Sequence, residues 1–212
     1  LFEVPAGGKR ILWARLNPVP QIDLFLSVFT RERKKLWMQD ANGAGKAEII
    51  VNLTLEPGKY YFKLGERWRT HSHRADLKHP WVLRWRLTAP SPGEEIEPND
   101  HRTQANPVVL GQEVRGYLSS GEDQDIFRLP DTNSTLRIDW TPPGKLASVV
   151  AFWPPKGKQA TRQIVLKAGQ SLSLRRVKIT DASRFLLVSS HKRGNNMTDR
   201  YRLKVSIQPA VQ

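Results

Sequence analysis

The sequence predicts an all-β protein built from two tandem jelly-roll-like β-sandwich domains. Three observations lead to this prediction: short apolar runs between turn residues, one strict alternation of apolar and polar residues, and a repeated order of segments in the two halves of the chain. No stretch has a sustained helical period. Hydrophobic residues make up 39% of the 212 residues, which is sufficient for a packed core.

The first predicted domain comprises residues 1–90. Its apolar runs are separated by segments that favour turns, and they occur at residues 1–5, 10–16, 23–29 and 59–64. From Trp81 to Leu87, large apolar residues alternate with Val82, Arg84 and Arg86. A period of two is typical of a strand with one buried face, so we expect Trp81 and Trp85 in the core. Residues 88–93 contain Pro and Gly and are expected to end the domain, because proline has no N–H for a strand ladder.

The second predicted domain, residues 91–212, repeats this order. Residues 126–130 correspond to residues 1–5, and residues 184–188 to residues 59–63, both at an offset of 125 positions. Residues 201–207 correspond to residues 81–87 at an offset of 120. A nearly constant offset indicates two copies of one module, in which Phe2 would superimpose on Phe127 and Leu83 on Leu203. The first copy lacks the acidic opening of the second, so we expect such a segment in the full-length protein, or a first domain completed in another way.

An acidic segment interrupts a strongly basic chain. The whole sequence has 34 Lys and Arg against 20 Asp and Glu, a net charge of +14, yet residues 91–128 hold eight acids and three bases. Carboxylates at alternate positions with an Asn among them are the hard oxygen donors that calcium prefers. No loop matches the EF-hand pattern, and the alternative is a solvated acidic linker between two basic domains.

The motifs of this segment resemble the opening of a bacterial pre-peptidase C-terminal domain. They are Glu95-x-Glu97-Pro98-Asn99-Asp100, Ala105-Asn106-Pro107, Val114-x-Gly116-x-Leu118 and Asp123-x-Asp125-x-Phe127. They are also similar to the collagen-binding domains of clostridial collagenases, in which an acidic linker and an Asp-x-Asp turn bind calcium. The resemblance covers residues 95–127 and implies a non-catalytic β-sandwich attached to an exported protein. Carried over residue by residue, it implies Ca²⁺ ligands at Glu95, Glu97, Asn99, Asp100, Asp123 and Asp125.

Several catalytic classes have no support in the sequence. There is no cysteine, which excludes a disulfide scaffold, a thiol nucleophile and a thiolate metal site. There is no Gly-x-Ser-x-Gly elbow and no Gly-rich phosphate loop. We therefore expect that the protein is not an enzyme. No apolar run approaches the ~20 residues of a membrane helix. Because leucine is not a natural first residue, we expect the sequence to come from a longer or processed chain.

The basic charge outside the acidic segment favours an anionic partner; the alternative is that it only keeps an exported protein soluble. Residues 1–90 carry a net charge of +8 and residues 129–212 carry +11, and fields of this size attract polyanions. Four tryptophans flanked by charged residues or proline are expected at the surface, where aromatic rings can stack on sugars or extended peptides: Trp37, Trp68, Trp140 and Trp153. The alternative for Trp153 is a tryptophan that only caps the edge of the sandwich. The predicted ligand-binding residues are Trp153, Lys156, Lys158, Arg175 and Arg176. Nucleic acid is disfavoured because no nucleic-acid motif accompanies these charges.

Together these patterns predict a non-catalytic accessory or binding module of an exported bacterial protein, located in the periplasm, at the cell surface or outside the cell. Its expected partner is an anionic polysaccharide, an extracellular matrix polymer or an acidic protein surface, and a parent enzyme domain is compatible with the resemblance. The alternative is a structural spacer or assembly domain that packs on a parent enzyme or partner protein and binds no polymer.

Overall fold

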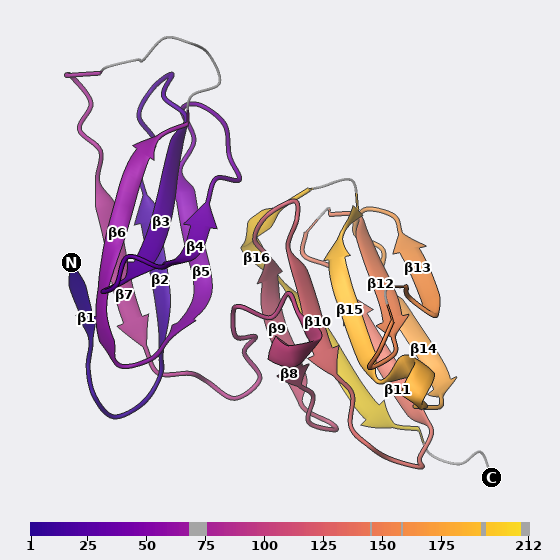
Figure 1. The fold of residues 1–212 in the computed structure, drawn as a ribbon. Coiled ribbons are helices and arrows are strands. Elements are labelled where there is room, and N and C mark those ends of the chain that lie inside the picture. The colour runs from indigo at the N-terminus through magenta and orange to yellow at the C-terminus, as the bar shows by residue number, and fades with distance from the viewer. Residues whose placement is uncertain (68–75, 145, 158, 192–193, 209–212) are drawn as a thin grey trace. The chain divides into compact units, whose positions relative to one another are not determined.

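The protein consists of two compact units, Leu1–Pro90 and Ser91–Gln212, in a computed structural model (Figure 1). The structure describes residues 1–212 except 68–75, 145, 158, 192–193 and 209–212. Apart from two short 3₁₀ helices, the regular elements of the described residues are all β-strands. No helix in this described part of the chain has the length and apolar character needed to cross a lipid bilayer.

The first unit contains two antiparallel sheets. One has the strand order β1-β6-β3-β4 and the other β5-β2-β7. The strands are β1 (Phe2–Val4), β2 (Arg10–Leu16), β3 (Leu24–Thr30), β4 (Lys35–Gln39), β5 (Glu48–Leu55), β6 (Gly58–Glu66) and β7 (Leu83–Thr88). Alternate residues of β2 face the core, where Leu12, Ala14 and Leu16 have no solvent exposure.

Two tryptophans of the first unit differ from the prediction. Trp81 precedes β7 and is 59% exposed, so its assignment to the core was wrong. Trp85 lies on the inward register of β7, where it contacts Phe2 with ring centroids 5.1 Å apart, but it remains 44% exposed. The alternation predicted which way Trp85 points. Its exposure follows from the position of β7 at a sheet edge, which alternation does not reveal.

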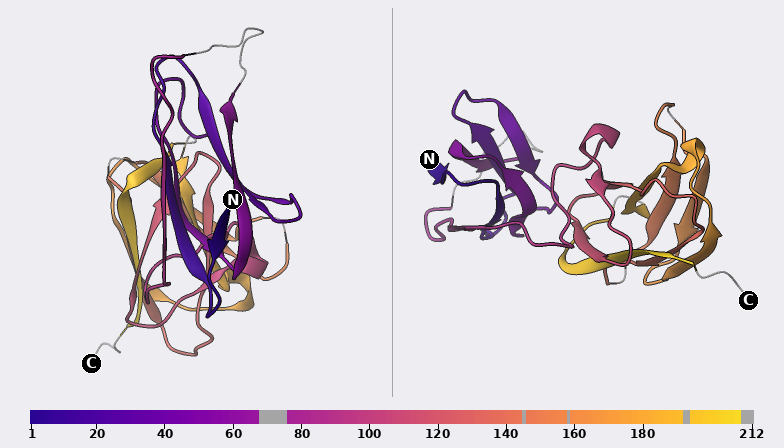
Figure 2. Two further views of the ribbon diagram at one scale, coloured as in Figure 1. Left: turned by 90° about the vertical axis from the view of Figure 1, so that its left-hand side faces the viewer. Right: turned by 90° about the horizontal axis from the view of Figure 1, so that it is seen from below.

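The second unit contains a five-stranded and a four-stranded sheet, with the orders β13-β12-β15-β10-β8 and β14-β11-β16-β9. Its elements are η1 (Arg102–Gln104), β8 (Asn106–Pro107), β9 (Glu113–Leu118), β10 (Gln124–Arg128), β11 (Leu136–Thr141), β12 (Ser148–Trp153), β13 (Arg162–Leu166), β14 (Leu172–Val177), η2 (Asp181–Ser183), β15 (Phe185–Ser190) and β16 (Asn196–Ile207). The β8–β10 pair is parallel and the other pairs are antiparallel. Both units are β-sandwiches, and Figure 2 shows them from two further sides.

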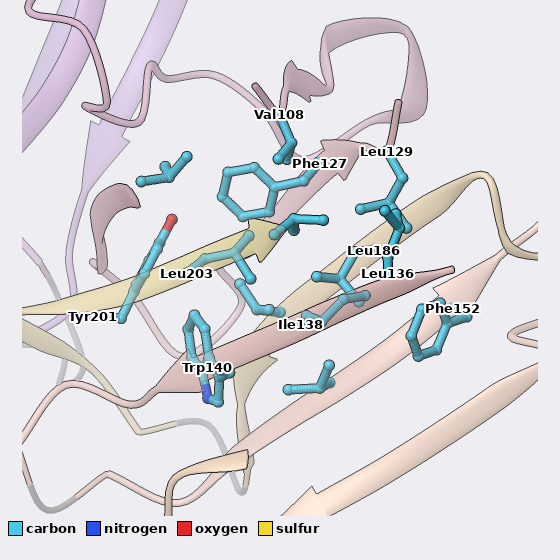
Figure 3. Packing of buried hydrophobic residues seen from close by; sticks show 14 of the residues in the cluster. Val108, Phe127, Leu129, Leu136, Ile138, Trp140, Phe152, Leu186, Tyr201 and Leu203 are labelled. Atoms are coloured by element: carbon cyan, nitrogen blue, oxygen red, sulfur yellow. The ribbon is translucent and has the colours of Figure 1, made fainter. Parts of the chain in front are cut away.

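Trp140 lies at the centre of the second core, so the prediction that it is a surface residue was wrong. Leu136, Ile138 and Trp140 alternate along β11 toward the interior, and Trp140 is 1% exposed (Figure 3). Its indole N–H donates to Ser148 Oγ at 3.1 Å, which satisfies its only polar group. The polar neighbours of Trp140 face outward because they occupy the opposite register of the strand.

The two units share one strand order, as the repeat predicted. Strands β10-β15-β12-β13 correspond to β1-β6-β3-β4, and β14-β11-β16 correspond to β5-β2-β7. No described sheet mixes strands of the two units. The second unit adds β8 and β9, for which the first unit has no counterpart among its described strands.

Strand pairing supports two of the predicted equivalences and corrects a third. Leu83 pairs with Leu16 at the end of β2, and Leu203 pairs with Trp140 on β11; each pair belongs to or packs against the core of its own unit, which agrees with the predicted equivalence of Leu83 and Leu203. Phe2 pairs with Tyr60, whereas Phe127 pairs with Leu186. Tyr60 therefore corresponds to Leu186 and not to Phe185. The predicted offset for this strand was wrong by one residue, which would have turned its side chains to the opposite face.

Candidate metal centre

Five buried polar residues meet where the N-terminal segment of the second unit folds over the start of β10. Glu95, Glu97 and Asn99 belong to that segment, and Asp123 and Asp125 belong to the turn into β10 and to β10 itself. Their exposed fractions are 1%, 2%, 0%, 4% and 0%. Four carboxyl groups are thus withdrawn from water in one region, which proteins rarely tolerate unless something compensates the charge.

Hydrogen bonds hold the acidic segment against the sandwich. The amide of Glu95 donates to the carbonyl of Arg115 at 2.9 Å, and the amide of Arg115 donates to the carbonyl of Gly93 at 2.8 Å. The side chain of Asn106 brackets Ile96: its Oδ1 accepts from the Ile96 amide at 2.8 Å, and its Nδ2 donates to the Ile96 carbonyl at 3.0 Å. Residues 95, 97 and 99 are buried in alternation, as expected of an extended segment with one face on the core.

The carboxylate oxygens of this group converge. One oxygen from each of Glu95, Glu97 and Asp125 lies within 4.8 Å of the other two. Glu95 accepts hydrogen bonds from the Tyr117 amide at 2.8 Å and from Asn99 Nδ2 at 3.1 Å. Glu97 Oε2 accepts from the Asn99 amide at 2.9 Å. These bonds orient Glu95 and Glu97, and the spacing of the three carboxylates suits shared coordination of one cation.

Several buried oxygens have no hydrogen-bond donor of good geometry among the described residues. They are Glu97 Oε1, Asn99 Oδ1, Asp123 Oδ1 and both carboxylate oxygens of Asp125. A buried acceptor without a donor costs about 1–3 kcal/mol, and more when it is charged. No ion pair within the described part of the chain involves Glu97, Asp123 or Asp125. Within the described residues, only protons or a cation from solution are left to compensate the charge of these three carboxylates.

Burial and mutual repulsion raise the pKa values of the buried acids. Desolvation is the main cause for Glu97, Asp123 and Asp125, and the neighbouring carboxylate of Glu95 is the next. The pKa of Asp123 rises to about 7, although a hydrogen bond from the Ser119 amide opposes the shift. The pKa values of Glu97 and Asp125 lie well above their usual range. Without a cation, the group retains protons that exposed carboxyl groups would have lost at neutral pH.

A glycine on β9 makes room for the cluster. A Cβ atom at Gly116 would lie 2.1 Å from Glu95 Oε2 and 2.3 Å from the hydroxyl oxygen of Tyr201. Tyr201 is fully buried and packs on Trp140, with ring centroids 4.7 Å apart. Figure 3 shows its hydroxyl directed away from Trp140. Gly116 thus allows Glu95 and Tyr201 to approach the backbone of β9 closely.

The donor atoms in this group are carboxylate and amide oxygens only. Such donors bind hard cations such as calcium and magnesium, whereas zinc and copper sites favour imidazole or thiolate ligands. Magnesium usually retains several waters, while calcium accepts 6–8 oxygens in flexible geometry. A buried group with four carboxylates and one amide carbonyl fits calcium better.

The structure buries five of the six predicted ligands and brings carboxylate oxygens of three of them, Glu95, Glu97 and Asp125, within 4.8 Å of one another. The sixth, Asp100, is partly exposed, and its Oδ1 accepts a hydrogen bond from the Gln124 amide at 3.2 Å. The carboxylate of Asp100 also adds to the repulsion that raises the pKa values of Glu97 and Asp123, so it lies at the border of the buried group. Two bordering residues, Gly116 and Tyr201, were not predicted. The Val-x-Gly-x-Leu motif contained a signal for Gly116, but Tyr201 lies on β16 and only the fold brings it near.

The predicted ligand-binding residues do not form one site. Trp153 is half-buried, and the guanidinium of Arg102 lies over its ring at 5.7 Å from the centroid, which agrees better with a tryptophan that caps the edge of the sandwich than with an open stacking platform. Arg102 is held there by hydrogen bonds to the carbonyls of Pro154 and Gly157. Lys156 is exposed in the loop after β12, whereas the exposed Arg175 and Arg176 lie on β14 in the other sheet. Lys158 and Trp68 lie outside the described residues.

Comparison with models of known protein families gave no match to this chain, and comparison with curated proteins found none of significant similarity. The resemblance of residues 95–127 to the pre-peptidase C-terminal domain therefore remains a prediction from motifs.

Proposed function

We propose that this protein is a non-catalytic accessory module of an exported bacterial protein, and that one calcium ion braces its second unit. The observation that supports this most strongly is the buried group of Glu95, Glu97, Asn99, Asp123 and Asp125. A divalent cation would offset carboxylate charge that has no basic partner within the described chain. The motif resemblance over residues 95–127 agrees with this proposal.

The role proposed for the ion is mechanical. It would connect the segment that carries Glu95 and Glu97 to Asp123 in the turn before β10 and to Asp125 in β10, and so fasten the N-terminal segment to the sandwich. A ligand that binds only the folded state stabilises it by mass action, and a concentration of 100 times the Kd contributes about 2.7 kcal/mol. For a domain of this size, that corresponds to a rise in Tm on the order of 10 °C.

Thermal unfolding in calcium and in chelator tests the proposal. The wild-type protein should melt about 10 °C higher in calcium at 100 times the Kd than in chelator. Asp125→Asn should remove this response. It should also raise the Tm in chelator, because it replaces a buried carboxylate whose pKa is raised by desolvation with a neutral group.

Glu122→Gln is the matched control. Glu122 lies in the same turn but is exposed, so its substitution should leave the calcium response intact. Identical melting curves of the wild-type protein in calcium and in chelator would refute calcium bracing.

The second part of the proposal concerns the partner. The net charge of +14 supports attraction to an anionic polysaccharide, matrix polymer or acidic protein surface. Retention on heparin should fall steeply with salt, because the binding would release counterions. Changing Lys156, Arg175 and Arg176 to Glu should weaken retention more than the same change at Lys46, Lys59 and Lys63, three exposed lysines of the first unit. Lack of retention at low salt would favour the alternative, a spacer or assembly domain without polymer binding.

A further inference from the structure

The outer face of the four-stranded sheet in the second unit is basic. This sheet has the order β14-β11-β16-β9, and the inward-facing residues of its strands belong to the core or pack against it (Figure 1). The bases that occupy the outward register are Arg115 on β9, Arg137 on β11, Arg175 and Arg176 on β14, and Arg202 and Lys204 on β16. Two acids lie among them, Glu113 and Asp139.

The two acids compensate only part of this charge. Glu113 forms an ion pair with Arg115 at 2.8 Å, and Asp139 forms one with Arg137 at 2.9 Å, in each case two residues along the same strand. The other four bases of the face are exposed, and they form no ion pair within the described residues. Four positive charges on one sheet face are therefore left without an ion-pair partner in the part of the chain that the structure describes.

A β-bulge in β14 adds one of these charges to the face. Within the bulge, β14 has two residues, Arg175 and Arg176, where β11 has only Arg137. The flanking residues of β14, Leu174 and Val177, pack against the core, whereas both arginines are exposed. The φ of Arg176 is 54°, in the left-handed region that residues other than glycine rarely adopt. Bulges re-aim side chains, and this one directs a second arginine outward at the cost of local backbone strain.

Like charges also face each other across the sheet. Arg202 of β16 lies directly opposite Arg115 of β9, an arrangement that is destabilising on adjacent strands. Lys204 lies between Glu113 and Asp139, the two acids that already bind arginines. Because neighbouring strands are about 4.8 Å apart, the bases extend about 14 Å across the four strands. An elongated ligand with repeated negative charges would relieve this repulsion.

The other side chains of the face indicate the class of this ligand. Tyr117 is the one aromatic residue in the outward register of the described strands, and Arg200 occupies it: its Nε donates to the hydroxyl at 2.9 Å, and its guanidinium lies 5.3 Å from the ring centroid. Nucleobases need an open ring on which to stack, and a membrane needs apolar side chains that enter it; the outward register of these described strands offers neither. Guanidinium groups bind carboxylate and similar oxyanions through two parallel hydrogen bonds.

We propose that the outer face of the sheet β14-β11-β16-β9 binds a linear anionic polysaccharide through its carboxylate or sulfate groups. Arg175, Arg176 and Arg202 supply the main contacts. This inference rests on the proposed function in taking an anionic polymer as the partner, and it assigns that polymer to one sheet. Trp153 and Lys156 are not part of the site.

Binding to heparin and to polygalacturonate across a salt series tests the proposal, and the two probes separate sulfate from carboxylate recognition. Changing Arg175, Arg176 and Arg202 to Glu should weaken binding to at least one of them by about tenfold or more and should reduce its salt dependence, because fewer counterions are released. The matched control changes Lys156, Arg162 and Lys167 to Glu. These three bases are exposed on or beside β12 and β13 in the other sheet, and the net charge changes equally. The control should bind within about threefold of the wild-type protein, since only the long-range field changes.

Arg202→Glu alone separates loss of ligand contact from misfolding. It places an acid opposite Arg115, so it should raise the Tm of the protein while weakening polysaccharide binding. Weaker binding accompanied by a lower Tm would contradict the account of the face.

Two further outcomes would overturn the proposal. If the control triple variant loses as much affinity as the triple variant of the sheet face, binding follows net charge; the anionic polymer of the proposed function would then stand without this site. If single-stranded DNA binds more tightly than either polysaccharide and loses its affinity in the sheet-face variant, nucleic acid is the ligand. A wild-type protein that binds neither polysaccharide at low salt would refute the site together with the polymer-binding part of the proposed function.

Discussion

Replacing Gly116 with alanine adds one methyl group at the point where three elements of the second unit meet. The new Cβ would lie 2.1 Å from Glu95 Oε2 and 2.3 Å from the hydroxyl of Tyr201. An ordinary contact is at least 3.4 Å, so both side chains must move away by about 1 Å, or the backbone of β9 must shift. Tyr201 packs on Trp140 in the core, so Glu95 is the side chain that moves more easily.

The cost of this movement follows from the contacts of Glu95. Overpacking a buried site costs about 1–3 kcal/mol. Displacement of Glu95 also weakens its 2.8 Å hydrogen bond from the Tyr117 amide, and a hydrogen bond to a charged group contributes about 1.5–3 kcal/mol. The free energy of unfolding should therefore fall by about 2–4 kcal/mol, which corresponds to a Tm decrease on the order of 10 °C. Calcium affinity should fall about 10–100-fold, because the substitution at Gly116 displaces Glu95, one of the proposed calcium ligands.

Chemical denaturation and calorimetric titration with calcium measure these two effects. Gly43→Ala is the matched control, since a Cβ at Gly43 meets no atom within 4 Å and the backbone there has no positive φ. If Gly116→Ala unfolds and binds calcium as the wild-type protein does, then Glu95 and Tyr201 do not approach β9 this closely, and the description of the acidic group is wrong.

Three further predictions concern the cores and the titrating acids. Trp140→Ala should lower the free energy of unfolding by about 3–5 kcal/mol in denaturant titrations, because it opens a cavity and leaves Ser148 without its indole donor. In chelator, the free energy of unfolding should fall as the pH rises from about 4 to 7, because the raised pKa of Asp123, about 7, makes the folded state bind more protons than the unfolded chain. Calcium affinity, measured by calorimetry, should rise over the same pH range. A free energy of unfolding or a calcium affinity that does not change with pH would contradict this prediction. Burial raises the pKa of Glu48 in the first unit to about 7, so the wild-type protein should lose stability as the pH rises from 4.5 to 7. Glu48→Gln should reduce this loss, which thermal melts of the wild-type protein and the variant across this pH range would measure.

Periodicity in the sequence was sufficient to predict the fold class and the repeat, but not which faces are covered. Trp85 points inward as its register predicts, yet it is half exposed because no described strand covers β7. Trp140 was assigned from its polar neighbours, although its alternation with Leu136 and Ile138 contained the correct signal. The predicted offset between residues 59–63 and residues 184–188 was wrong by one residue. The register of β6 is set by its pairing with β1, a tertiary contact that the sequence pattern does not show.

The sequence was sufficient to predict which residues form the acidic group, but not how they are arranged in space. Alternation of Glu95, Glu97 and Asn99 indicated one shared face, and the structure buries all three. Asp100 has the same chemistry but bonds the Gln124 amide at the surface, a distinction that depends on where the chain turns. The position of Tyr201 beside the acidic group was not predictable, because β16 reaches the acidic group only through its pairing with β9 and β11.

The most direct test of the central claim is a crystal structure of the protein grown in calcium, with an anomalous difference map. The account predicts one strong peak in the second unit, with oxygens of Glu95, Glu97 and Asp125 at about 2.3–2.6 Å. A well-ordered second unit without a peak at this position, or with a basic side chain among these carboxylates, would contradict it.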